Sequence, residues 1–345
     1  MQHAITIPMS SSTNMQISYE RALEAFGRLE DSCQLPTISP AYVLIDAERD
    51  KELAPFFWLY EEGEKLVYQG GHLASIPGTQ YRDIQTPYQY GGPVSNTVDS
   101  AFLLRAWQEY TPWCSENAVA VEFVRFHPML RNWDLYPGEA VFNRAAVWVD
   151  LALSDLMTSY KPRVRTALRT AVKNGLRVEW RSGPESTEWF TKFYHTAMRE
   201  IGTEQFYFFP PSYFHRLLEW EKARLAVCIG GGEPIAAAVF LVGSKVTEYH
   251  LAAASQVGKR LGGTTLLLHE AAQTTQSEGC RALYLGGGTD GEPDNPLLTF
   301  KAHFSEERAE FRIGRHVHFN EGYISLREQF SEAYAAHRSR VLFYR

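Results

Sequence analysis

Residues 261–304 read LGGTTLLLHEAAQTTQSEGCRALYLGGGTDGEPDNPLLTFKAHF, and this stretch decides the fold. Apolar residues recur at helical spacing between Leu266 and Ala272, and Gly279 stands where a helix-terminating glycine is expected. The short apolar run 282–285 precedes three glycines and therefore predicts a buried strand that ends in a loop. Because glycines let backbone N–H groups approach a ligand closely, we expect a ligand to be held at this edge.

The composition is that of a folded chain that is large enough for two lobes. The 345 residues are 45% hydrophobic and 13% aromatic, which provides ample core. The formal net charge of −6 argues against a protein that coats nucleic acid without sequence preference, but it is compatible with a local basic patch. The four cysteines are far apart and form no CxxC pair, so neither a zinc knuckle nor a redox motif is indicated, and a reduced cytoplasm fits best.

The opening residues do not resemble a secretion signal. The sequence MQHAITIPMSSSTN lacks a basic region followed by an apolar one, and no run of about 18 apolar residues exists to span a bilayer. We therefore expect a cytoplasmic protein without a transmembrane segment, for which any membrane contact would be peripheral.

The order of the predicted elements divides the chain into two lobes. Residues 1–150 are expected to form an N-terminal lobe, and a short apolar run at 42–45 in it favours a strand. Residues 151–345 are expected to form a C-terminal lobe that begins with a helix over 162–173. We predict an α+β fold in which each lobe has a mixed, mainly antiparallel sheet flanked by helices. One arrangement compatible with the sequence is that the tail after about residue 317 packs back on the first lobe.

A basic stripe marks the first helix of the second lobe. Its four residues lie at four-residue spacing, which keeps them within roughly a third of the helix circumference; they are Lys161, Arg165, Arg169 and Lys173. No acidic residue occurs between Leu156 and Val178, whereas an ordinary solvated face mixes Glu with Lys. The stripe therefore favours binding of an anion, such as the phosphate groups of a donor or an acceptor, over a merely solvated surface.

The segment 83–94, DIQTPYQYGGPV, combines residues that shape loops. Two prolines, two glycines and two tyrosines make regular structure unfavourable here. Two interpretations stand side by side: a packed loop of tyrosine and proline, or a wall of the ligand cleft. In the second interpretation Asp83, Tyr88 and Tyr90 contact the substrate.

Several common catalytic motifs are absent from the sequence. It contains no GxSxG, no GxxxxGK[ST], no HExxH, and no GxGxxG that enters a βαβ unit, which disfavours hydrolases, kinases and dehydrogenases. His316 and His318 would share one strand face, but a two-residue spacing without a third ligand is weak. We therefore expect no metal site.

What remains is a meander, a glycine turn, a helix and a strand, an order that resembles the N-acetyltransferases of the GNAT superfamily. In those enzymes an [RQ]-x-x-G-x-[GA] turn grips the pyrophosphate of acetyl-CoA at a helix N-terminus. The aligned residues here are KRLGGT, 259–264, in which Gly262 matches, while Lys259 replaces Arg or Gln and Thr264 replaces Gly or Ala. The resemblance implies that Gly262 and Gly263 bind substrate.

The full pattern more closely resembles the FemA/FemB/FemX group, whose members have two GNAT-like lobes and transfer amino acids from aminoacyl-tRNA to an amine of a cell-wall precursor. The stretches that carry the resemblance are TPYQYGGP (86–93), YKPRVRTALRTAVKNGLRVE (160–179), LLLHEAAQTTQSEGCRALYLGGG (266–288) and FKAHF (300–304). The long coiled-coil insertion of some members is missing, as in the smaller members. Relatives that share these motifs are associated with surface polysaccharide or small-molecule conjugation, so the resemblance implies acyl transfer to an amine more firmly than it implies the acceptor.

By this resemblance Phe300 and Lys301 match the family's aromatic–lysine pair near the aminoacyl donor. Attack of an amine on an ester or thioester creates an oxyanion, which a fixed cation stabilises in the transition state. The bland alternative is a surface lysine after a core phenylalanine. Candidates for a general base by position are Glu248, His250 and Asp290, although water or the substrate can also serve. Further residues expected to line the cleft are Tyr249, Gly287, Gly288 and Thr289.

Three functions are compatible with these features. The first is a FemX-like transferase that moves an aminoacyl group from the 3′ end of tRNA to a phosphate-bearing amine, in a cell-wall or surface-glycan precursor or a small metabolite. The second is an acyl-CoA-dependent N-acyltransferase that acts on a sugar amine or a small metabolite. The third is a GNAT-like binding module without turnover. None of them requires a tightly bound cofactor, and the acceptor, the transferred group and the oligomeric state stay open.

Overall fold

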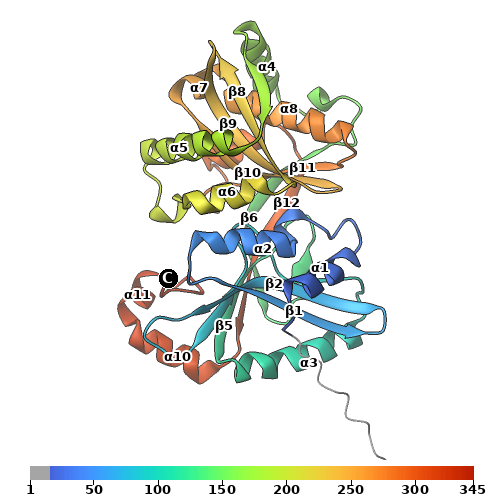
Figure 1. Cartoon of the computed structure of the whole chain (residues 1–345), viewed down its shortest axis with the longest axis vertical. Helices are drawn as coiled ribbons and strands as arrows, with labels where there is room; N and C mark the ends of the chain where they lie inside the picture. Colours follow the sequence, from blue (N-terminus) through green and yellow to red (C-terminus); the bar gives the residue numbers. More distant parts are fainter. Residues whose placement is uncertain (1–15) are drawn as a thin grey trace, which may run out of the picture.

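The computed structural model describes residues 16–345 and arranges them in two lobes stacked along the long axis of the molecule (Figure 1). The elements of the N-terminal lobe are α1 (Tyr19–Gly27), α2 (Pro40–Asp46), β1 (Ala54–Glu62), β2 (Lys65–Ser75), β3 (Arg82–Gln85), β4 (Val94–Ser95), α3 (Ser100–Glu116) and β5 (Val119–Arg125). Strand β6 (Glu139–Asp150) then leads from this lobe into the next.

The C-terminal lobe begins with α4 (Pro162–Lys173), β7 (Arg177–Arg181), α5 (Pro184–Ile201) and α6 (Pro211–Glu219). It continues through β8 (Ala223–Gly230), β9 (Glu233–Val242), β10 (Val246–Ala254), α7 (Gln256–Leu261), α8 (Gly263–Ser277), β11 (Ala282–Gly287) and α9 (Pro296–Lys301). Strand β12 (Arg308–Val317) runs back to the first lobe, where α10 (Asn320–Gln329) and α11 (Ser331–Ala336) follow (Figure 1).

The strands of residues 16–345 pair in one continuous sheet that passes through both lobes. Its order is β1-β2-β3-β5-β12-β6-β11-β10-β9-β8-β7, with β4 attached to β2. Most neighbours are antiparallel, whereas β3–β5 and β10–β11 are parallel. Strand β6 pairs with β12 through residues 139–147 and with β11 through residues 146–150. The mixed, mainly antiparallel α+β fold is therefore confirmed, and the sheets of the two lobes are fused through β6.

The sequence favoured a strand at 42–45 in the N-terminal lobe, and this prediction is wrong, because these residues belong to helix α2. Ser39 caps α2 by accepting a hydrogen bond from the amide of Ala41 at 3.2 Å, and Pro40 occupies the first turn. A short run of apolar residues is compatible with a buried strand and with a buried helix. When an element is covered on all sides, its sequence is apolar throughout and shows neither the strand nor the helix periodicity. Tyr42 and Ile45 of this helix pack in one apolar cluster with Tyr213, Leu217 and other residues of α6 and β8–β10.

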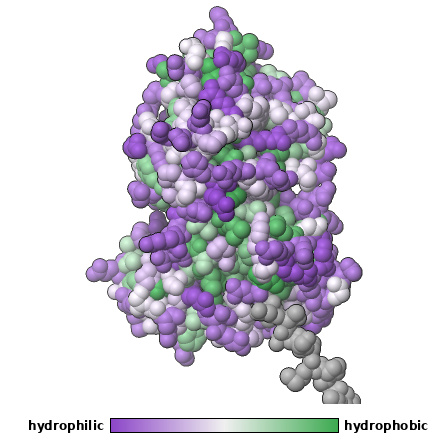
Figure 2. Space-filling view, in the orientation of Figure 1, coloured by the Kyte–Doolittle hydropathy of each residue, from purple (hydrophilic) through white to green (hydrophobic). Residues whose placement is uncertain are grey.

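Apolar burial at the junction thus holds the two lobes together. On the face drawn in Figure 2, hydrophobic residues gather near the centre, where the lobes meet, and hydrophilic residues predominate at the two ends. None of the helices in residues 16–345 combines the length and the apolar character needed to cross a bilayer.

The segment that follows β12 packs on the first lobe. Tyr323, Leu326 and Phe343 share an apolar cluster with Ile76 and Val121. Residues 341–344, whose sequence is typical of a strand, form turns instead. The division of the chain at residue 150 stays a prediction, since β6 belongs to the sheets of both lobes.

Asp83 was predicted to line the ligand cleft, and the structure corrects this. Its carboxylate is fully buried and accepts hydrogen bonds from Arg345 Nη2 at 2.7 Å and from the hydroxyl of Tyr344 at 3.1 Å. Burial raises the pKa of Asp83, and the charge of Arg345 opposes the shift. Asp83 therefore ties the segment 341–345 to β3 and is not a substrate-binding residue.

We expect Arg345→Ala to lower the free energy of unfolding by about 2–3 kcal/mol at neutral pH, because it leaves a buried carboxylate unpaired. The loss should shrink as the pH falls, since an acid with a raised pKa becomes neutral earlier than an exposed one. Urea denaturation at several pH values measures both effects. Arg338→Ala, at an exposed position of the same segment, is the control; a loss that does not depend on pH would contradict the assignment.

Candidate active site

Strands β10 and β11 separate in the middle of the C-terminal half of the sheet. These parallel strands pair only between residues 246–248 and 282–284. Beyond that point β10 has an irregularity between Tyr249 and Leu251, and β11 has one between Tyr284 and Gly286. Once two strands stop pairing, side chains from other elements can enter between them, and Lys301 does so here: its Nζ lies 5.9 Å from the centre of the Tyr249 ring.

Lys301 is the one charged residue of α9, and only 7% of it is accessible. Its Nζ donates a hydrogen bond to the carbonyl oxygen of Gly287 at 2.8 Å. Burial and the nearby charge of Arg144 lower the pKa of Lys301 to about 7. The lysine therefore lies inside the protein, poised between its two protonation states near neutral pH, which excludes the alternative of a surface lysine.

The glycine loop 286–288 passes close to these two cations. Arg144 of β6 donates from Nη1 to the carbonyl oxygen of Gly288 at 2.7 Å, so the two loop carbonyls bind one cation each. Gly286 adopts φ +82°, and a Cβ there would lie 3.3 Å from Lys301 Nζ. A Cβ at Gly288 would lie 2.5 Å from Oδ1 of Asn295. The loop needs glycine because backbone and side chains approach it too closely for a side chain.

Asn295 links the loop to α9. Its side-chain oxygen caps the helix by accepting from the amides of Leu297 and Leu298, at 3.0 and 3.1 Å. Its amide nitrogen donates to Thr289 Oγ1 at 2.7 Å and to Asp290 Oδ2 at 3.0 Å. Thr289 and Asp290, both predicted for the site, thus belong to the exposed rim of the loop, and Asp290 also accepts from the amide of Glu292.

The other two candidate bases are engaged between the lobes. Glu248 is fully buried and accepts from the hydroxyl of Thr37 at 2.9 Å. His250 is 5% exposed, its Nε2 lies 2.8 Å from the hydroxyl of Tyr213, and burial lowers its pKa to about 3. His250 Nε2 also lies 3.5 Å from the hydroxyl of Tyr42, so the side chains of both Glu248 and His250 contact the N-terminal lobe at the junction.

The segment 86–93 wraps around the same junction. Tyr90 forms a hydrogen bond of 2.6 Å with the hydroxyl of Tyr284 on β11. The ring of Tyr88 packs edge-on against His250 at 5.8 Å, and its backbone amide donates to Asp46. Arg49 and His72 hold the pKa of that buried carboxyl below its usual range although burial alone would raise it. The tyrosines predicted for the site do lie beside it, with Tyr90 nearest to the glycine loop.

A cavity of about 350 Å³ lies between α4 and the start of α8. Helix α8 begins at Gly263 without a side-chain cap, after Gly262 in the left-handed conformation at φ +79°. Its first amides therefore have no partner within the helix and favour an anion. The cations on the rim are Arg163, Lys259 and Arg260, while His303 and Phe300 contribute an imidazole and an apolar side.

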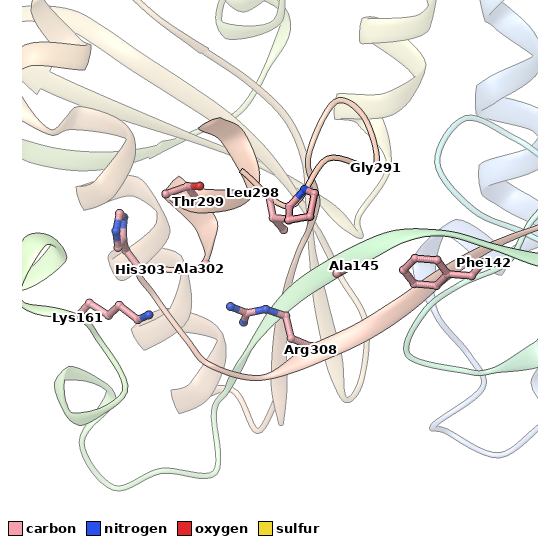
Figure 3. Close-up of a pocket in the computed structure, with 10 residues that line it drawn as sticks. Phe142, Ala145, Lys161, Gly291, Leu298, Thr299, Ala302, His303 and Arg308 are labelled. Atoms are coloured by element: carbon pink, nitrogen blue, oxygen red, sulfur yellow. The ribbon is translucent and has the colours of Figure 1, made fainter. Parts of the chain in front are cut away.

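A second cavity, of about 390 Å³, lies on the other side of α9 (Figure 3). Its floor comes from β6 and from residues 298–302, and the loop at Gly291 borders it. Figure 3 shows the side chains of Lys161 and Arg308 extending toward the same space from α4 and β12. His303 lines both cavities. Helix α9, which carries Lys301, therefore separates two cavities with basic rims.

The structure does not bring the basic stripe together at one site. Lys161 lines the second cavity, Arg165 bonds to the carbonyl of Tyr160, and Arg169 and Lys173 line a third cavity against α8. A four-residue spacing on a straight helix spans too great a length to serve one pocket. The residues that the sequence interpretation missed are Arg144, Arg163, His303, Arg308 and Tyr284; only the local richness in Arg and Lys signalled some of them.

Comparisons with known proteins agree with this arrangement. Residues 158–301 match a family model described as an acetyltransferase (GNAT) domain. No curated protein matches the sequence. Among solved structures, FemX is similar with a TM-score of 0.67 at 12% identity, over 92% of this chain and 99% of FemX. L-PGS from Bacillus licheniformis is similar with a TM-score of 0.59 at 16% identity, over 88% of this chain and 93% of that one. The C-terminal domain of a candidate lysylphosphatidylglycerol synthetase from Agrobacterium fabrum is similar with a TM-score of 0.57 at 17% identity, over 92% of this chain and 98% of that one.

Residues 158–301 of the C-terminal lobe therefore match a GNAT acetyltransferase domain, and this match supports an amide-forming acyltransferase activity for the chain. Its two-lobed architecture is that of FemX, which confirms the resemblance to the FemA/FemB/FemX group at the level of the fold. At such low identities the likeness concerns the fold alone, so the substrates have to be argued from the site.

We expect Gly288→Ala to lower the free energy of unfolding by about 1–3 kcal/mol, because the new Cβ meets Oδ1 of Asn295. Asn295→Ala alone should cost about 1 kcal/mol through the lost cap. The double variant should lose less stability than the sum of the two single changes, because Asn295→Ala removes the two closest contacts of the new Cβ and leaves only the Cβ of residue 295 at 3.0 Å. Gly27→Ala, which meets nothing within 4 Å, is the control in the same urea titration. Strict additivity of the two changes would refute the contact.

Proposed function

We propose that this protein transfers an aminoacyl group from aminoacyl-tRNA to the amine of a phosphate-bearing acceptor and forms an amide. The observation that carries the proposal is the position of Lys301, buried under the glycine loop in the helix that separates two basic cavities. The acceptor would be a cell-wall or surface-glycan precursor or a small metabolite. The protein would act in the cytoplasm, where aminoacyl-tRNA is available, with at most peripheral membrane contact and no tightly bound cofactor.

In the proposed reaction the acceptor amine attacks the ester carbonyl of the donor. A C–N bond forms, the C–O bond to the terminal ribose breaks, and the amine proton goes to the departing ribose oxygen. The oxyanion of the intermediate needs a nearby positive charge, which the ammonium of Lys301 would supply in a low-dielectric surrounding. Since Glu248 and His250 are engaged with Thr37 and Tyr213, a water molecule or the substrate itself would carry the proton.

The two cavities suit two substrates that bear phosphate. The cavity between α4 and α8 combines three Arg and Lys side chains with free helix amides, as a phosphodiester chain requires. The cavity below α9 presents Lys161 and Arg308, which suit the phosphate groups of an acceptor. Phe300 lies on the rim of the first cavity and offers a ring on which a terminal base can stack.

A second candidate function is acyl transfer from acyl-CoA. The observation that favours it is the glycine turn at Gly262 and Gly263 before α8, beside Lys259 and Arg260, because such a turn suits a compact pyrophosphate. A third candidate, binding without turnover, is supported by the same cations. Incubation with labelled aminoacyl-tRNAs in one tube and labelled acetyl-CoA in another, each with a mixed amine extract, separates the three. Label lost from tRNA faster than by spontaneous hydrolysis supports the proposal; label lost only from acetyl-CoA supports the second candidate.

We expect Lys301→Ala to reduce turnover by roughly 100- to 1000-fold, as does the loss of other oxyanion-stabilising groups. The free energy of unfolding at neutral pH should change little, because the lost hydrogen bond, worth about 1 kcal/mol, is offset by the removal of a desolvated amine. Lys51→Ala, at an exposed position, is the control. Unchanged turnover with the true donor would refute the role of Lys301.

The pH dependence tests which form of Lys301 acts. With a pKa of about 7, the ammonium is present at lower pH and is lost as the pH rises through neutrality, so its contribution to turnover should fall in that direction. Lys301→Arg keeps its charge at every pH used. Because the acceptor amine titrates equally in both proteins, the ratio of wild-type to Lys301→Arg turnover isolates the lysine. A ratio that rises with pH would show instead that the neutral amine acts as a base.

Arg163→Glu and Lys259→Glu should weaken donor binding and should reduce the dependence of binding on salt, because each replaces a cation on the rim of one cavity. Lys173→Glu is the matched control on the same helix, since Lys173 borders a different cavity. Filter binding of the donor at several salt concentrations measures both effects. An equal loss in all three variants would indicate a general electrostatic attraction and would contradict the assigned cavity.

A further inference from the structure

Three side chains that can bind a metal meet inside the N-terminal lobe, and none of them takes part in the candidate active site. Glu122 of β5 lies directly opposite His316 of β12 in the register of the two strands. His318 follows two residues later and therefore points to the same face. One ligand atom from each residue lies within 4.8 Å of the others. The sequence offered no third ligand for the two histidines, whereas the fold supplies Glu122.

The histidine nitrogens lack other partners. Neither ring nitrogen of His318 has a hydrogen-bond partner among residues 16–345, and the same holds for Nδ1 of His316. The side chains of Glu122 and His318 are both fully buried. An unpaired buried polar group costs roughly 1–3 kcal/mol, so three such nitrogens in one place need an explanation. One of them, Nε2 of His318, lies near the carboxylate of Glu122 without forming a hydrogen bond to it.

The spacing fits two ligands of one metal ion better than a hydrogen bond. Nε2 of His318 lies 3.6 Å from Oε2 of Glu122, which is beyond hydrogen-bond distance. Zinc bonds of about 2.0–2.2 Å at the tetrahedral angle place two ligand atoms roughly 3.3–3.6 Å apart. The separation of this pair already matches a tetrahedral site, and since all three ligand atoms lie within 4.8 Å of one another, the cluster would contract by at most about 1.5 Å to hold an ion.

Three polar side chains contact the carboxylate of Glu122 and fix its orientation, and its Oε2 still lies near His318. The hydroxyl of Tyr110 lies 3.3 Å from its Oε1, the hydroxyl of Tyr136 lies 3.4 Å from its Oε2, and the side-chain amide of Gln69 also donates to Oε1. Hydrogen bonds of this kind fix the ligands of a metal in known sites and raise its affinity. The side-chain oxygen of Gln69 has no partner among the described residues and is available near the cluster.

We propose that Glu122, His316 and His318 bind a divalent transition-metal ion of the zinc type. Two imidazoles and one carboxylate are ligands that suit Zn²⁺, and the fourth position would go to water. Because β12 lies between β5 and β6 in the sheet, the ion would cross-link β12 to β5 and stabilise the return of the chain to the first lobe. This inference does not depend on the proposed reaction.

The test uses the full chain, stripped with a chelator and titrated with Co²⁺ as a spectroscopic substitute for Zn²⁺. We expect one equivalent to bind with a visible d–d spectrum, Zn²⁺ to displace it, and either ion to raise the melting temperature. His318→Ala and the isosteric Glu122→Gln should weaken binding by more than about tenfold. His337→Ala, which removes an exposed histidine of the same lobe, should bind as the wild type does.

The proposal is overturned if the wild-type protein binds no stoichiometric metal, or if both variants bind it as tightly as the wild type. Circular dichroism shows whether each variant folds. If neither does, X-ray absorption of the wild-type cobalt protein decides the matter, since two imidazole ligands are expected and a spectrum without imidazole would refute the site.

Discussion

The register of β6 is the constraint on which the rest of the structure depends. Ala146 and Val147 pair on one side with Gly287 and Gly286 of β11, and on the other side with the start of β12. A shift by one residue would turn every side chain of the strand to the opposite face. Arg144 would then point away from the carbonyl of Gly288, and the loop above Lys301 would lose one of its two cations. The two lobes and the candidate site are thus fixed by the same few backbone hydrogen bonds.

The burial of Lys301 explains why the loop beside it consists of glycines. A buried ammonium near a second cation is unfavourable unless oxygen atoms surround it. The carbonyls of Gly287 and Gly288 supply these oxygens, and they can do so only where no side chain stands in the way. The remaining penalty appears as the lowered pKa of Lys301. Such a shift is typical of functional sites, where a group is held in a state that water would not favour.

Local patterns in the sequence predicted the local elements of the site, and tertiary structure decided the remainder. Helix α8, strand β11 and the glycine loop follow from periodicity, a terminating glycine and the run of three glycines. The roles of Asp83 and Glu122 could not be predicted, because their partners Arg345 and His318 lie 262 and 196 residues away along the chain. The error at 42–45 has the same origin, since only contact with α6 determines that this run is a helix covered on both sides.

The positions of Glu248 and His250 bear on how a chain of this fold can carry out catalysis. Both occupy the strand that a general base would be expected to use, yet the first bonds to Thr37 and the imidazole of the second lies 3.5 Å from the hydroxyl of Tyr42, so both contact the N-terminal lobe. A carboxylate and an imidazole that stabilise a junction cannot also exchange protons with a substrate without loosening it. Groups that do not join the lobes are free of this conflict. Among the residues discussed above, Lys301 meets this condition, because its ammonium contacts a loop carbonyl within its own lobe.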